Sequence, residues 1–275
     1  MKPVTRALAD ATRRLEATSD THRLDAELLM AAALEIERDT LLLDPPAGPV
    51  PDAFAAMLDR RLAGEPVAYI TGRRAFWNIE LTVGPGALIP RPDSEVLIVT
   101  AIDHFAGLAG PKRILDLGTG PGTLLLAALD LWPGATGIGV DSSAPALEYA
   151  RANAKRLGLA PRAHFRRGDW AAGINEQFDL ILCNPPYVAE DAELGPGVAE
   201  FEPHEALFAG DSGLDAFRAL APQLPGLLGK GGLAMVEIGF DQAESAARIL
   251  SATGFKAELK HDLGGRPRAL ALTWD

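Results

Sequence analysis

The sequence has a single cysteine, Cys183, among its 275 residues, so the chain cannot form an internal disulfide bond. It also has no apolar run that approaches the ~20 residues that a helix needs to cross a bilayer. The segment Met1–Arg6 leads into an amphipathic pattern and not into the apolar stretch of a signal peptide. Together these absences predict a cytoplasmic protein with no membrane-spanning segment.

The sequence has few basic residues: 26 Lys and Arg against 37 Asp and Glu. The net charge is therefore −11. The sequence contains no run of Lys or Arg, which argues against an extended surface for binding nucleic acid. A local basic groove stays possible. The five histidines are scattered and lack the spacing of metal ligands. We therefore expect no direct binding of nucleic acid and no metal site.

The first part of the chain carries a helical pattern. Apolar residues recur at helical spacing from Val4 to about Leu62, with a proline-rich break at Pro45–Pro49 and a new start at Asp52. A chain of this length can hold one large α/β domain and a smaller one. We therefore predict a small helical domain over residues 1–72, which either recognises a substrate or merely stabilises the rest.

Strand patterns begin after this helical region. Residues 75–83 alternate between apolar and polar side chains and end at Gly84-Pro85-Gly86; with Val67–Ile70 before them, they predict a β-hairpin linker over residues 73–90. From there, strand and helix patterns alternate, which is typical of an α/β fold with a parallel sheet. The predicted strands are 113–117, 135–140, 163–167, 178–183, 233–238, 256–261 and 269–273, and the predicted helices are 93–105, 124–131, 214–228 and 241–252.

A glycine-rich turn follows the first predicted strand, in the order Asp116-Leu117-Gly118-Thr119-Gly120-Pro121-Gly122-Thr123. Glycines at such a place allow a tight turn and a close approach of the backbone to a ligand. The turn contains no lysine, which excludes a P-loop for triphosphates. The acidic Asp116 would repel a pyrophosphate but could pair with an ammonium group, so S-adenosylmethionine fits better than NAD, which stays possible from the glycines alone.

The next two predicted strands also end in residues that suit a nucleoside. Asp141 ends the second strand roughly twenty residues after the turn, where an acidic residue binds ribose hydroxyls in such sheets. Asp169 and Trp170 follow the third strand, and we expect Trp170 to lie beside an adenine ring. The alternatives are that Asp141 only caps a helix and that Trp170 is an ordinary core residue.

The fourth strand leads into the stretch around which the chain is organised, Asn184-Pro185-Pro186-Tyr187. Proline fixes its own φ and keeps the preceding residue out of the helical region, so Asn184 is held stiffly at the carboxyl end of a buried strand. An amide nitrogen is a weak nucleophile, and two acceptors that receive its N–H groups would orient it. The side-chain oxygen of Asn184 and the carbonyl of Pro185 suit that task, with Tyr187 as an aromatic wall.

These motifs together resemble the class I S-adenosylmethionine-dependent amino-methyltransferases, and in particular the release-factor glutamine methyltransferases of the HemK/PrmC family. The resemblance rests on the glycine-rich turn, on Asp141 and on the Asn-Pro-Pro-Tyr stretch, and it extends to Ile89–Glu95, Phe201–Pro203, Gly210–Gly213 and Glu237–Gly239. It covers most of the chain. Three departures are Pro121, which removes an N–H from the turn, Thr123, where the family more often has a small apolar residue, and Ser94, which replaces the commoner threonine and keeps its hydroxyl.

The resemblance implies a Rossmann-like seven-stranded methyltransferase domain over residues 91–275, behind a helical domain and a hairpin. It implies methylation of the glutamine N5 in the Gly-Gly-Gln loop of peptide-chain release factors, with S-adenosylhomocysteine as the second product. We expect a monomer. The implied catalytic residues are Asn184, Pro185 and Tyr187; the cofactor residues are Asp116, Gly118, Thr119, Gly120, Pro121, Gly122, Asp141, Asp169, Trp170 and Asn184; the substrate residues are Asn184, Pro185, Pro186, Tyr187 and Arg91.

Two other functions stay open at this point. An N-methyltransferase for DNA or RNA bases would use the same Asn-Pro-Pro-Tyr chemistry, but it should carry a basic recognition region, which the charge of −11 argues against. A non-catalytic regulator that binds S-adenosylmethionine would have no use for an oriented acceptor at Asn184. The acidic stretch 188–203, rich in glycine and proline, is predicted to be either a mobile flap over the substrate or a plain surface loop.

Overall fold

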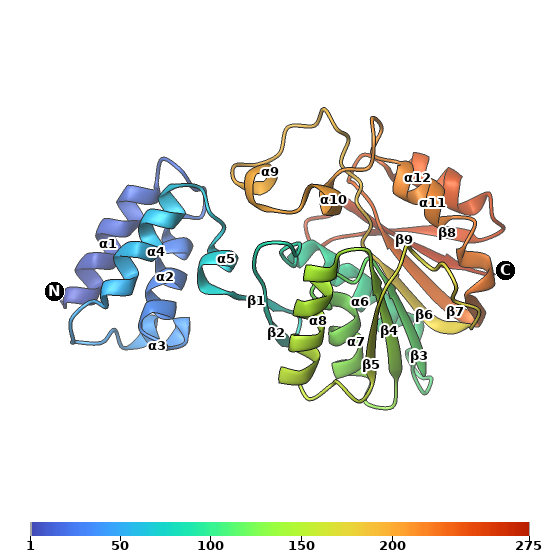
Figure 1. Cartoon of the computed structure of the whole chain (residues 1–275), viewed down its shortest axis with the longest axis horizontal. Coiled ribbons are helices and arrows are strands. Elements are labelled where there is room, and N and C mark those ends of the chain that lie inside the picture. Colours follow the sequence, from blue (N-terminus) through green and yellow to red (C-terminus); the bar gives the residue numbers. More distant parts are fainter. Residues whose placement is uncertain (1, 275) are drawn as a thin grey trace. The chain divides into compact units, whose positions relative to one another are not determined.

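The computed structural model describes residues 2–274, which form two compact units that we treat separately (Figure 1). The first unit comprises the residues up to Arg73 together with Leu194–Phe201. The second comprises Arg74–Glu193 and the residues from Glu202 onward. The acidic stretch after the Asn-Pro-Pro-Tyr motif is thus divided, and its middle part belongs to the first unit.

The first unit is a bundle of helices whose apolar residues turn inward, as their spacing predicts. Leu15, Leu29, Met30 and Phe54 are among the side chains of its buried core. The break at Pro45–Pro49 separates two of the helices, also as expected. The helices are α1 (Pro3–Leu15), α2 (His22–Ala33), α3 (Arg38–Leu43), α4 (Asp52–Leu62), α5 (Val67–Thr71) and, from the later segment, α9 (Val198–Phe201).

The later segment of this unit approaches α4 closely at its C-terminal end. A Cβ atom on Gly197 would lie 2.4 Å from the carbonyl oxygen of Gly64, and Gly197 has a φ of +80°. Both the space and the backbone conformation therefore require glycine at this position. Part of the stretch that the sequence suggested as a flap is held against the helical unit.

The hairpin forms, but not with the residues expected at its start. It consists of β1 (Arg73–Phe76) and β2 (Ile79–Thr82), whereas Val67–Ile70, expected to lead into it as a strand, belong to the helix α5. The physical reason is that the N–H groups of Tyr69 and Ile70 both donate to the carbonyl of Pro66, which starts a helical turn. Gly72, in the left-handed conformation, then ends that helix.

One buried asparagine fixes the hairpin to the rest of the second unit. The side chain of Asn153 accepts a hydrogen bond from the N–H of Thr82 at 2.8 Å and donates to the carbonyl of the same residue at 3.0 Å. It also donates to the carbonyl of Pro121 in the glycine-rich turn at 3.0 Å. The hairpin is therefore fixed to the same helix, α8 (Ala144–Arg156), that supports the turn.

The second unit contains the seven-stranded sheet that the resemblance implied, in the order β5-β4-β3-β6-β7-β9-β8 (Figure 1). The first five strands in this order are parallel neighbours, and β9 is antiparallel to both β7 and β8. The predicted terminal antiparallel pair is thus confirmed. The strands are β3 (Arg113–Leu117), β4 (Thr136–Asp141), β5 (Ala163–Arg167), β6 (Phe178–Cys183), β7 (Leu228–Glu237), β8 (Lys256–His261) and β9 (Pro267–Thr273).

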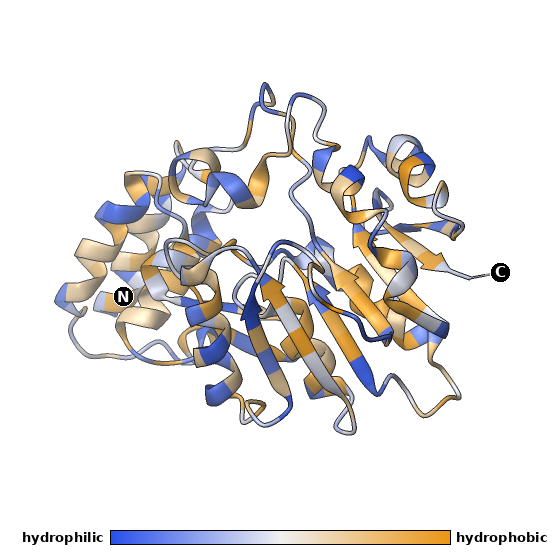
Figure 2. Cartoon of the chain, turned by 45° about the vertical axis from the view of Figure 1, so that its right-hand side comes forward, coloured by the Kyte–Doolittle hydropathy of each residue, from blue (hydrophilic) through white to orange (hydrophobic). Residues whose placement is uncertain are grey.

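Helices cover both faces of this sheet, as a parallel sheet requires. Helices α7 (Thr123–Leu131) and α8 lie on one face with α6 (Glu95–His104), and α11 (Asp215–Leu220) and α12 (Ala243–Ser251) lie on the other (Figure 1). Hydrophobic residues (orange in Figure 2) occur along the strands of this sheet. Short turns complete the unit: the 3-10 helices η1 (Pro92–Ser94) and η2 (Leu224–Gly226), and α10 (His204–Leu207).

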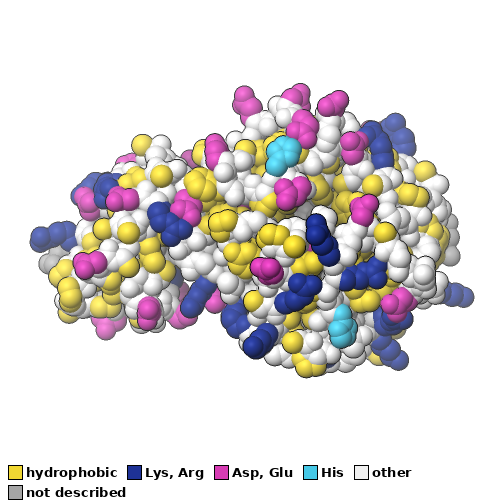
Figure 3. Space-filling view, in the orientation of Figure 1, with side chains coloured by type: hydrophobic (Ala, Val, Ile, Leu, Met, Phe, Trp, Pro, Cys, Tyr) yellow, Lys and Arg dark blue, Asp and Glu magenta, His cyan; other side chains and the backbone are white. Residues whose placement is uncertain are grey.

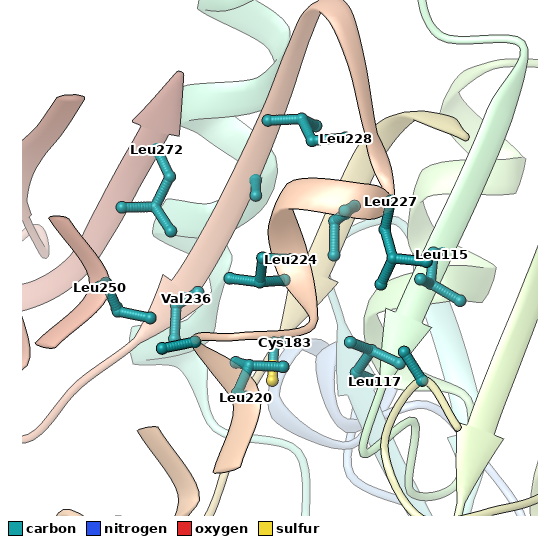
Figure 4. Close-up of a cluster of buried hydrophobic side chains, with 14 of the residues drawn as sticks. Leu115, Leu117, Cys183, Leu220, Leu224, Leu227, Leu228, Val236, Leu250 and Leu272 are labelled. Carbon is teal, nitrogen blue, oxygen red and sulfur yellow. The ribbon is translucent and has the colours of Figure 1, made fainter. Parts of the chain in front are cut away.

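Cys183 lies in the core on the face that α11 and α12 cover. Its sulfur is fully buried among leucine side chains such as Leu117 and Leu220 (Figure 4). Burial raises the pKa of this thiol well above its usual value, because the thiolate would lose its hydration. The cysteine therefore belongs to the hydrophobic core and not to the chemistry, as its place at the end of a buried strand predicted.

The sequence-based prediction was wrong between residues 214 and 232. The expected helix 214–228 ends as α11 at Leu220, and the strand begins at Leu228 instead of at residue 233. Pro222 and Pro225 lack the N–H groups that a continuous helix would need, so only the short η2 forms there. Gly231 has a φ of +76°, and the strand continues through it with an irregular register instead of stopping.

Both signs of charge occur on the surface. On the face drawn in Figure 3, Lys and Arg side chains lie among Asp and Glu side chains. Within residues 2–274, no helix combines the length and the apolar character needed to cross a membrane. Over the same residues, His, Cys, Asp and Glu do not gather in a group that could hold a metal ion.

Candidate active site

The carboxyl ends of β4, β3 and β6 meet at one edge of the sheet, because these strands are parallel neighbours. A pocket of about 180 Å³ opens at this edge. Of the site residues expected from the sequence, Gly122, Pro185 and Tyr187 are not among the described residues that line it. The expected residues that do line it are Arg91, Asp116, Gly118, Thr119, Gly120, Pro121, Asp141, Asp169, Trp170, Asn184 and Pro186.

The glycine-rich turn uses the conformational freedom of its glycines. Gly118, Gly120 and Gly122 all have positive φ, at +71°, +56° and +90°. Gly122 does not reach the pocket but forms the N-cap of α7, and a Cβ there would lie 2.8 Å from the side chain of Leu126. Its role is therefore to allow the close packing of the turn and the helix.

The N–H groups of this turn are already used within the protein. Those of Gly118 and Thr119 both donate to the carbonyl of Val140, at 2.9 and 3.0 Å, and that of Gly120 donates to the carboxylate of Asp141 at 2.8 Å. A phosphate-binding turn needs such groups to point at the ligand. The turn is therefore built to hold the strand ends together rather than to cradle a pyrophosphate, which disfavours NAD.

Asp116 is a buried carboxyl with one unused oxygen. Its Oδ2 accepts hydrogen bonds from the hydroxyl of Thr119 at 2.6 Å and from the N–H of Leu125 at 3.2 Å. Its Oδ1 is buried and finds no hydrogen-bond partner among the described residues. Burial raises the pKa of this carboxyl to about 7. A cationic group in the pocket would satisfy Oδ1 and return the carboxyl to its charged form.

Asp141 lines the same pocket. It is not the N-cap of α8, which was the alternative interpretation of its place in the sequence. The N-cap of α8 is Ser143, whose side chain accepts from the N–H of Ala146. The two oxygens of Asp141 instead accept from the N–H groups of Gly120 and Ser143, at 2.8 Å each. Burial raises the pKa of Asp141, and these bonds counter the rise. Each oxygen keeps a lone pair for a further donor such as a ribose hydroxyl.

We expect Asp141→Ala to weaken the binding of S-adenosylmethionine by about 1.5–3 kcal/mol, the scale of hydrogen bonds to a charged group. Titration calorimetry of the folded variant measures the loss. Asp141→Asn is the matched control, since it keeps the shape and one acceptor oxygen and should lose less. An Asp141→Ala variant that is folded and binds the cofactor with wild-type affinity would remove Asp141 from the site.

Trp170 combines a strained backbone with a place in the pocket wall. Its φ of +47° is unfavourable for a bulky side chain and costs on the order of 1–2 kcal/mol, a strain that often marks a functional site. The ring packs partly on the core cluster and partly lines the pocket. Trp170 is therefore partly a core residue, and the part of its ring that lines the pocket could stack on a planar ligand. Asp169 lines the pocket beside it.

Asn184 directly follows β6, and both Asn184 and Ser94 line the pocket. Its Nδ2 donates a hydrogen bond to the hydroxyl of Ser94 at 3.2 Å. Ser94 itself is buried, at 1% exposure. The side-chain oxygen of Asn184 is left to accept from a ligand. Sequence reasoning did not assign a role to Ser94, since no local signal links residues so far apart in the chain.

The hydroxyl of Tyr187 binds buried polar side chains, and Tyr187 is not among the described residues that line the pocket. The hydroxyl donates to Oε1 of Glu237 at 3.3 Å and accepts from the guanidinium of Arg268 at 3.5 Å. Burial raises the pKa of Tyr187, so the phenol stays neutral. Glu237 is also buried, and burial raises its pKa to about 7. The hydroxyl of Tyr187 therefore has a structural partner, and only its ring is left for the expected role beside the substrate.

Arg91 lines the pocket but is already paired. Its guanidinium donates to Oε1 of Glu202, whose Oε2 accepts from the N–H of Ile89 at 2.9 Å. Glu202 is 5% exposed, so this ion pair anchors the point at which the chain re-enters the second unit. The residues just after it complete the pocket wall. These are Pro203, Glu205 and Ala206, and Ser142 and Ser143 after β4 also line the pocket. Sequence reasoning did not assign these five residues to the site, because no motif marks them.

Two family profiles match the chain. The profile described as PrmC N-terminal domain matches residues 6–72, and that described as methyltransferase domain matches residues 110–222. A curated release factor glutamine methyltransferase of Rhodospirillum rubrum is 44% identical over 254 residues, which cover 90% of this chain and 78% of that protein. One of Bradyrhizobium diazoefficiens is 41% identical over 271 residues, which cover 95% of this chain and 91% of that protein.

Solved structures share the fold. A methyltransferase from Pyrococcus furiosus gives a TM-score of 0.54 at 16% identity and covers 79% of this chain and 98% of its own. A 16S rRNA methyltransferase of T. thermophilus, solved with AdoMet and guanosine, gives 0.52 at 18% identity and covers 74% of this chain and 50% of its own. At these identities the likeness shows the class I methyltransferase fold alone.

Proposed function

We propose that this chain, which belongs to the family of release factor glutamine methyltransferases, transfers the methyl group of S-adenosylmethionine to a glutamine of peptide-chain release factors. The acceptor is the side-chain nitrogen N5 of the glutamine in their Gly-Gly-Gln motif, and the second product is S-adenosylhomocysteine. The observation that carries the proposal is that the amide of Asn184 lines the same pocket as the carboxyls of Asp116 and Asp141.

The residues present fit this cofactor. The unpartnered Oδ1 of Asp116 suits the ammonium of its methionine part, and the free lone pairs of Asp141 suit its ribose hydroxyls. The exposed face of the Trp170 ring suits its adenine, with Asp169 beside it. When bound, S-adenosylmethionine supplies a methyl group on a positively charged sulfur, which a nitrogen can attack in line.

Asn184 and Pro185 hold and aim the substrate amide. The side-chain oxygen of Asn184 and the carbonyl of Pro185 accept its two N–H groups, so its nitrogen presents the lone pair toward the methyl group. A strong base before the attack is unnecessary, because the nitrogen becomes acidic only once methylation has made it cationic. Pro186 lines the pocket wall, and Tyr187 packs against the hydrophobic core. Positioning therefore carries most of the rate.

The helical domain, residues 1–72, is proposed to recognise the release factor. The match to the PrmC N-terminal domain profile supports this assignment. Residues 73–90 then act as the linker and residues 91–275 as the catalytic domain. The same proposal has the protein act as a monomer in the cytoplasm, where release factors work, and has Arg91 lie close to the bound Gly-Gly-Gln segment.

Transfer of a labelled methyl group to three acceptors tests this function. We expect label on a purified release factor, and none on the same factor after its Gly-Gly-Gln glutamine is replaced by alanine. DNA and RNA oligonucleotides that contain unpaired adenine and cytosine serve as the third acceptor and should stay unlabelled. Label on the oligonucleotides would indicate a nucleic-acid methyltransferase, and cofactor binding without transfer to any acceptor would indicate a regulator.

A further inference from the structure

Two motifs on which the resemblance rests, Gly210–Gly213 and Glu237–Gly239, have glycines that the proposed chemistry does not use. The last glycine of each motif forms a hydrogen bond with the side-chain amide of Gln242, the N-cap residue of α12. The same amide donates to the carbonyl of Tyr187 at 2.8 Å. One side chain thus joins both motifs to the end of the Asn-Pro-Pro-Tyr stretch.

The orientation of the Gln242 amide is fixed by its partners. Its oxygen accepts from the N–H of Gly239 at 3.0 Å, and a backbone N–H can only donate. Its nitrogen donates to the carbonyls of Tyr187 and Gly213, at 2.8 and 3.2 Å, and a carbonyl can only accept. A flipped amide would lose all three bonds. Gln242 is 9% exposed, so water could replace few of them.

The backbone approaches this amide so closely that both motifs require glycine. A Cβ atom on Gly213 would lie 2.3 Å from the carbonyl oxygen of Tyr187 and 2.8 Å from Nε2 of Gln242. A Cβ atom on Gly239 would lie 2.9 Å from Oε1 of Gln242. The two glycines therefore allow the contacts that Gln242 makes with the Asn-Pro-Pro-Tyr stretch.

The two prolines leave the middle of this stretch without hydrogen bonds. Neither Pro185 nor Pro186 has an N–H, and within residues 2–274 no hydrogen bond uses the carbonyl of either residue. The stretch is therefore held at its two ends, by the side chain of Asn184 and by Tyr187. The carbonyl of Pro185, proposed to accept one N–H of the substrate amide, lies where these two ends place it.

At the Tyr187 end, the bond to Gln242 is the shortest of the polar contacts. It measures 2.8 Å, whereas the two contacts of the Tyr187 hydroxyl measure 3.3 and 3.5 Å, which is long for a hydrogen bond. The next residue, Val188, is hydrogen-bonded to residues 207 and 209, which lie outside the sheet of seven strands. Gln242 is thus the link from this end of the stretch to the end of β7 and the start of α12.

We propose that Gln242 is a positioning residue for methyl transfer. By holding the carbonyl of Tyr187, it fixes the second end of the Asn-Pro-Pro-Tyr stretch and with it the place of the Pro185 carbonyl. Gln242 is not among the described residues that line the pocket, so it acts through the stretch and not by contact with the cofactor. The inference rests on the proposed function for the identity of the substrate, but the three bonds lie within the protein.

The test uses Gln242→Met and Gln242→Glu in the full-length enzyme. Methionine has nearly the shape of glutamine without its amide, and glutamate keeps the acceptor for Gly239 but has no N–H for the two carbonyls. Both should lower kcat by about tenfold or more, the effect of one lost hydrogen bond on the position of a reacting group. The loss should appear in kcat per cofactor-binding site, at saturating cofactor, and not in the number of such sites.

Ser245→Ala is the matched control. The Ser245 hydroxyl donates to the backbone carbonyl of Gln242 at 3.0 Å, so its removal weakens the same helix start and leaves the side-chain amide in place. It should keep kcat within about twofold of the wild type, as most substitutions away from a site do. Cofactor affinity, measured by calorimetry, should also stay within about twofold in all three variants, which shows that they are folded.

Hydrogen exchange measured by mass spectrometry gives a readout that needs no substrate. In the enzyme with cofactor and no release factor, the backbone amides of residues 187–190 should exchange faster in Gln242→Met than in the wild type or in Ser245→Ala. Wild-type kcat in Gln242→Met, an equal loss of kcat in Ser245→Ala, or unchanged exchange would overturn the inference. If the release factor is not methylated at all, the exchange result still decides whether Gln242 holds the stretch.

Discussion

Replacement of Asn184 by alanine should lower turnover by at least about 100-fold, the effect of losing one preorganised polar contact in an active site. The loss is large because the substrate nitrogen is a poor nucleophile until it is held by its N–H groups, and alanine removes one of the two acceptors. Asn184 lines the pocket and its amide nitrogen is bound to Ser94, so its oxygen is left to accept from a ligand. Steady-state kinetics with a release factor, at saturating cofactor, measures the effect.

Asn184→Asp is the informative control. It is nearly the same shape and still accepts, so any loss of rate reports on charge and solvation in the pocket, and we expect partial activity. Cofactor binding to both variants, measured by calorimetry, separates a failure of chemistry from a failure of the site to form. If Asn184→Ala kept near wild-type turnover with cofactor bound, some other residue would have to orient the amide.

Removal of the helical domain, residues 1–72, should abolish methylation of the intact release factor while cofactor binding survives. The reason is that the pocket and the residues proposed to hold the cofactor all lie in the second unit. Since Leu194–Phe201 belong to the first unit, the truncated variant should also carry a short Gly-Ser segment in their place, so that no apolar surface is left without its partner.

The matched control is the full chain with only residues 194–201 replaced by the same Gly-Ser segment. It separates the contribution of that segment from the contribution of the helices. Activity of both variants is measured on the intact factor and on a short peptide that contains Gly-Gly-Gln. Equal turnover of the intact factor by the wild type and the truncated variant would make the helical domain a stabilising appendage without a role in recognition.

Much of the fold could be predicted because its signals are local. The apolar pattern of the strand that ends at Cys183 predicts that it is buried on both faces of the sheet. Pro185 and Pro186 follow it and determine where it ends. The spacing between the glycine-rich turn and Asp141 is set by one helix and one short strand, so it can be read from the sequence. These residues then come together because the strands that carry them are parallel neighbours.

Other features could not be predicted from local patterns in the sequence. Pro222 and Pro225 interrupt an apolar stretch whose pattern otherwise predicts one helix. The carbonyl of Pro66 starts a helical turn, so Val67–Ile70 form a helix instead of a strand. The bond between Asn184 and Ser94 joins residues ninety positions apart. The orientation of the key amide could therefore not be read from the sequence.

The central claim is that this pocket directs a methyl group onto one amide nitrogen. Fragmentation mass spectrometry of a release factor, after incubation with enzyme and S-adenosylmethionine, tests it most directly. We expect one added methyl group on the side-chain nitrogen of the Gly-Gly-Gln glutamine, and we expect the Asn184→Ala variant to leave that residue unmodified under the same conditions. A methyl group on any other residue, or an unmodified factor after incubation with the wild-type enzyme, would contradict it.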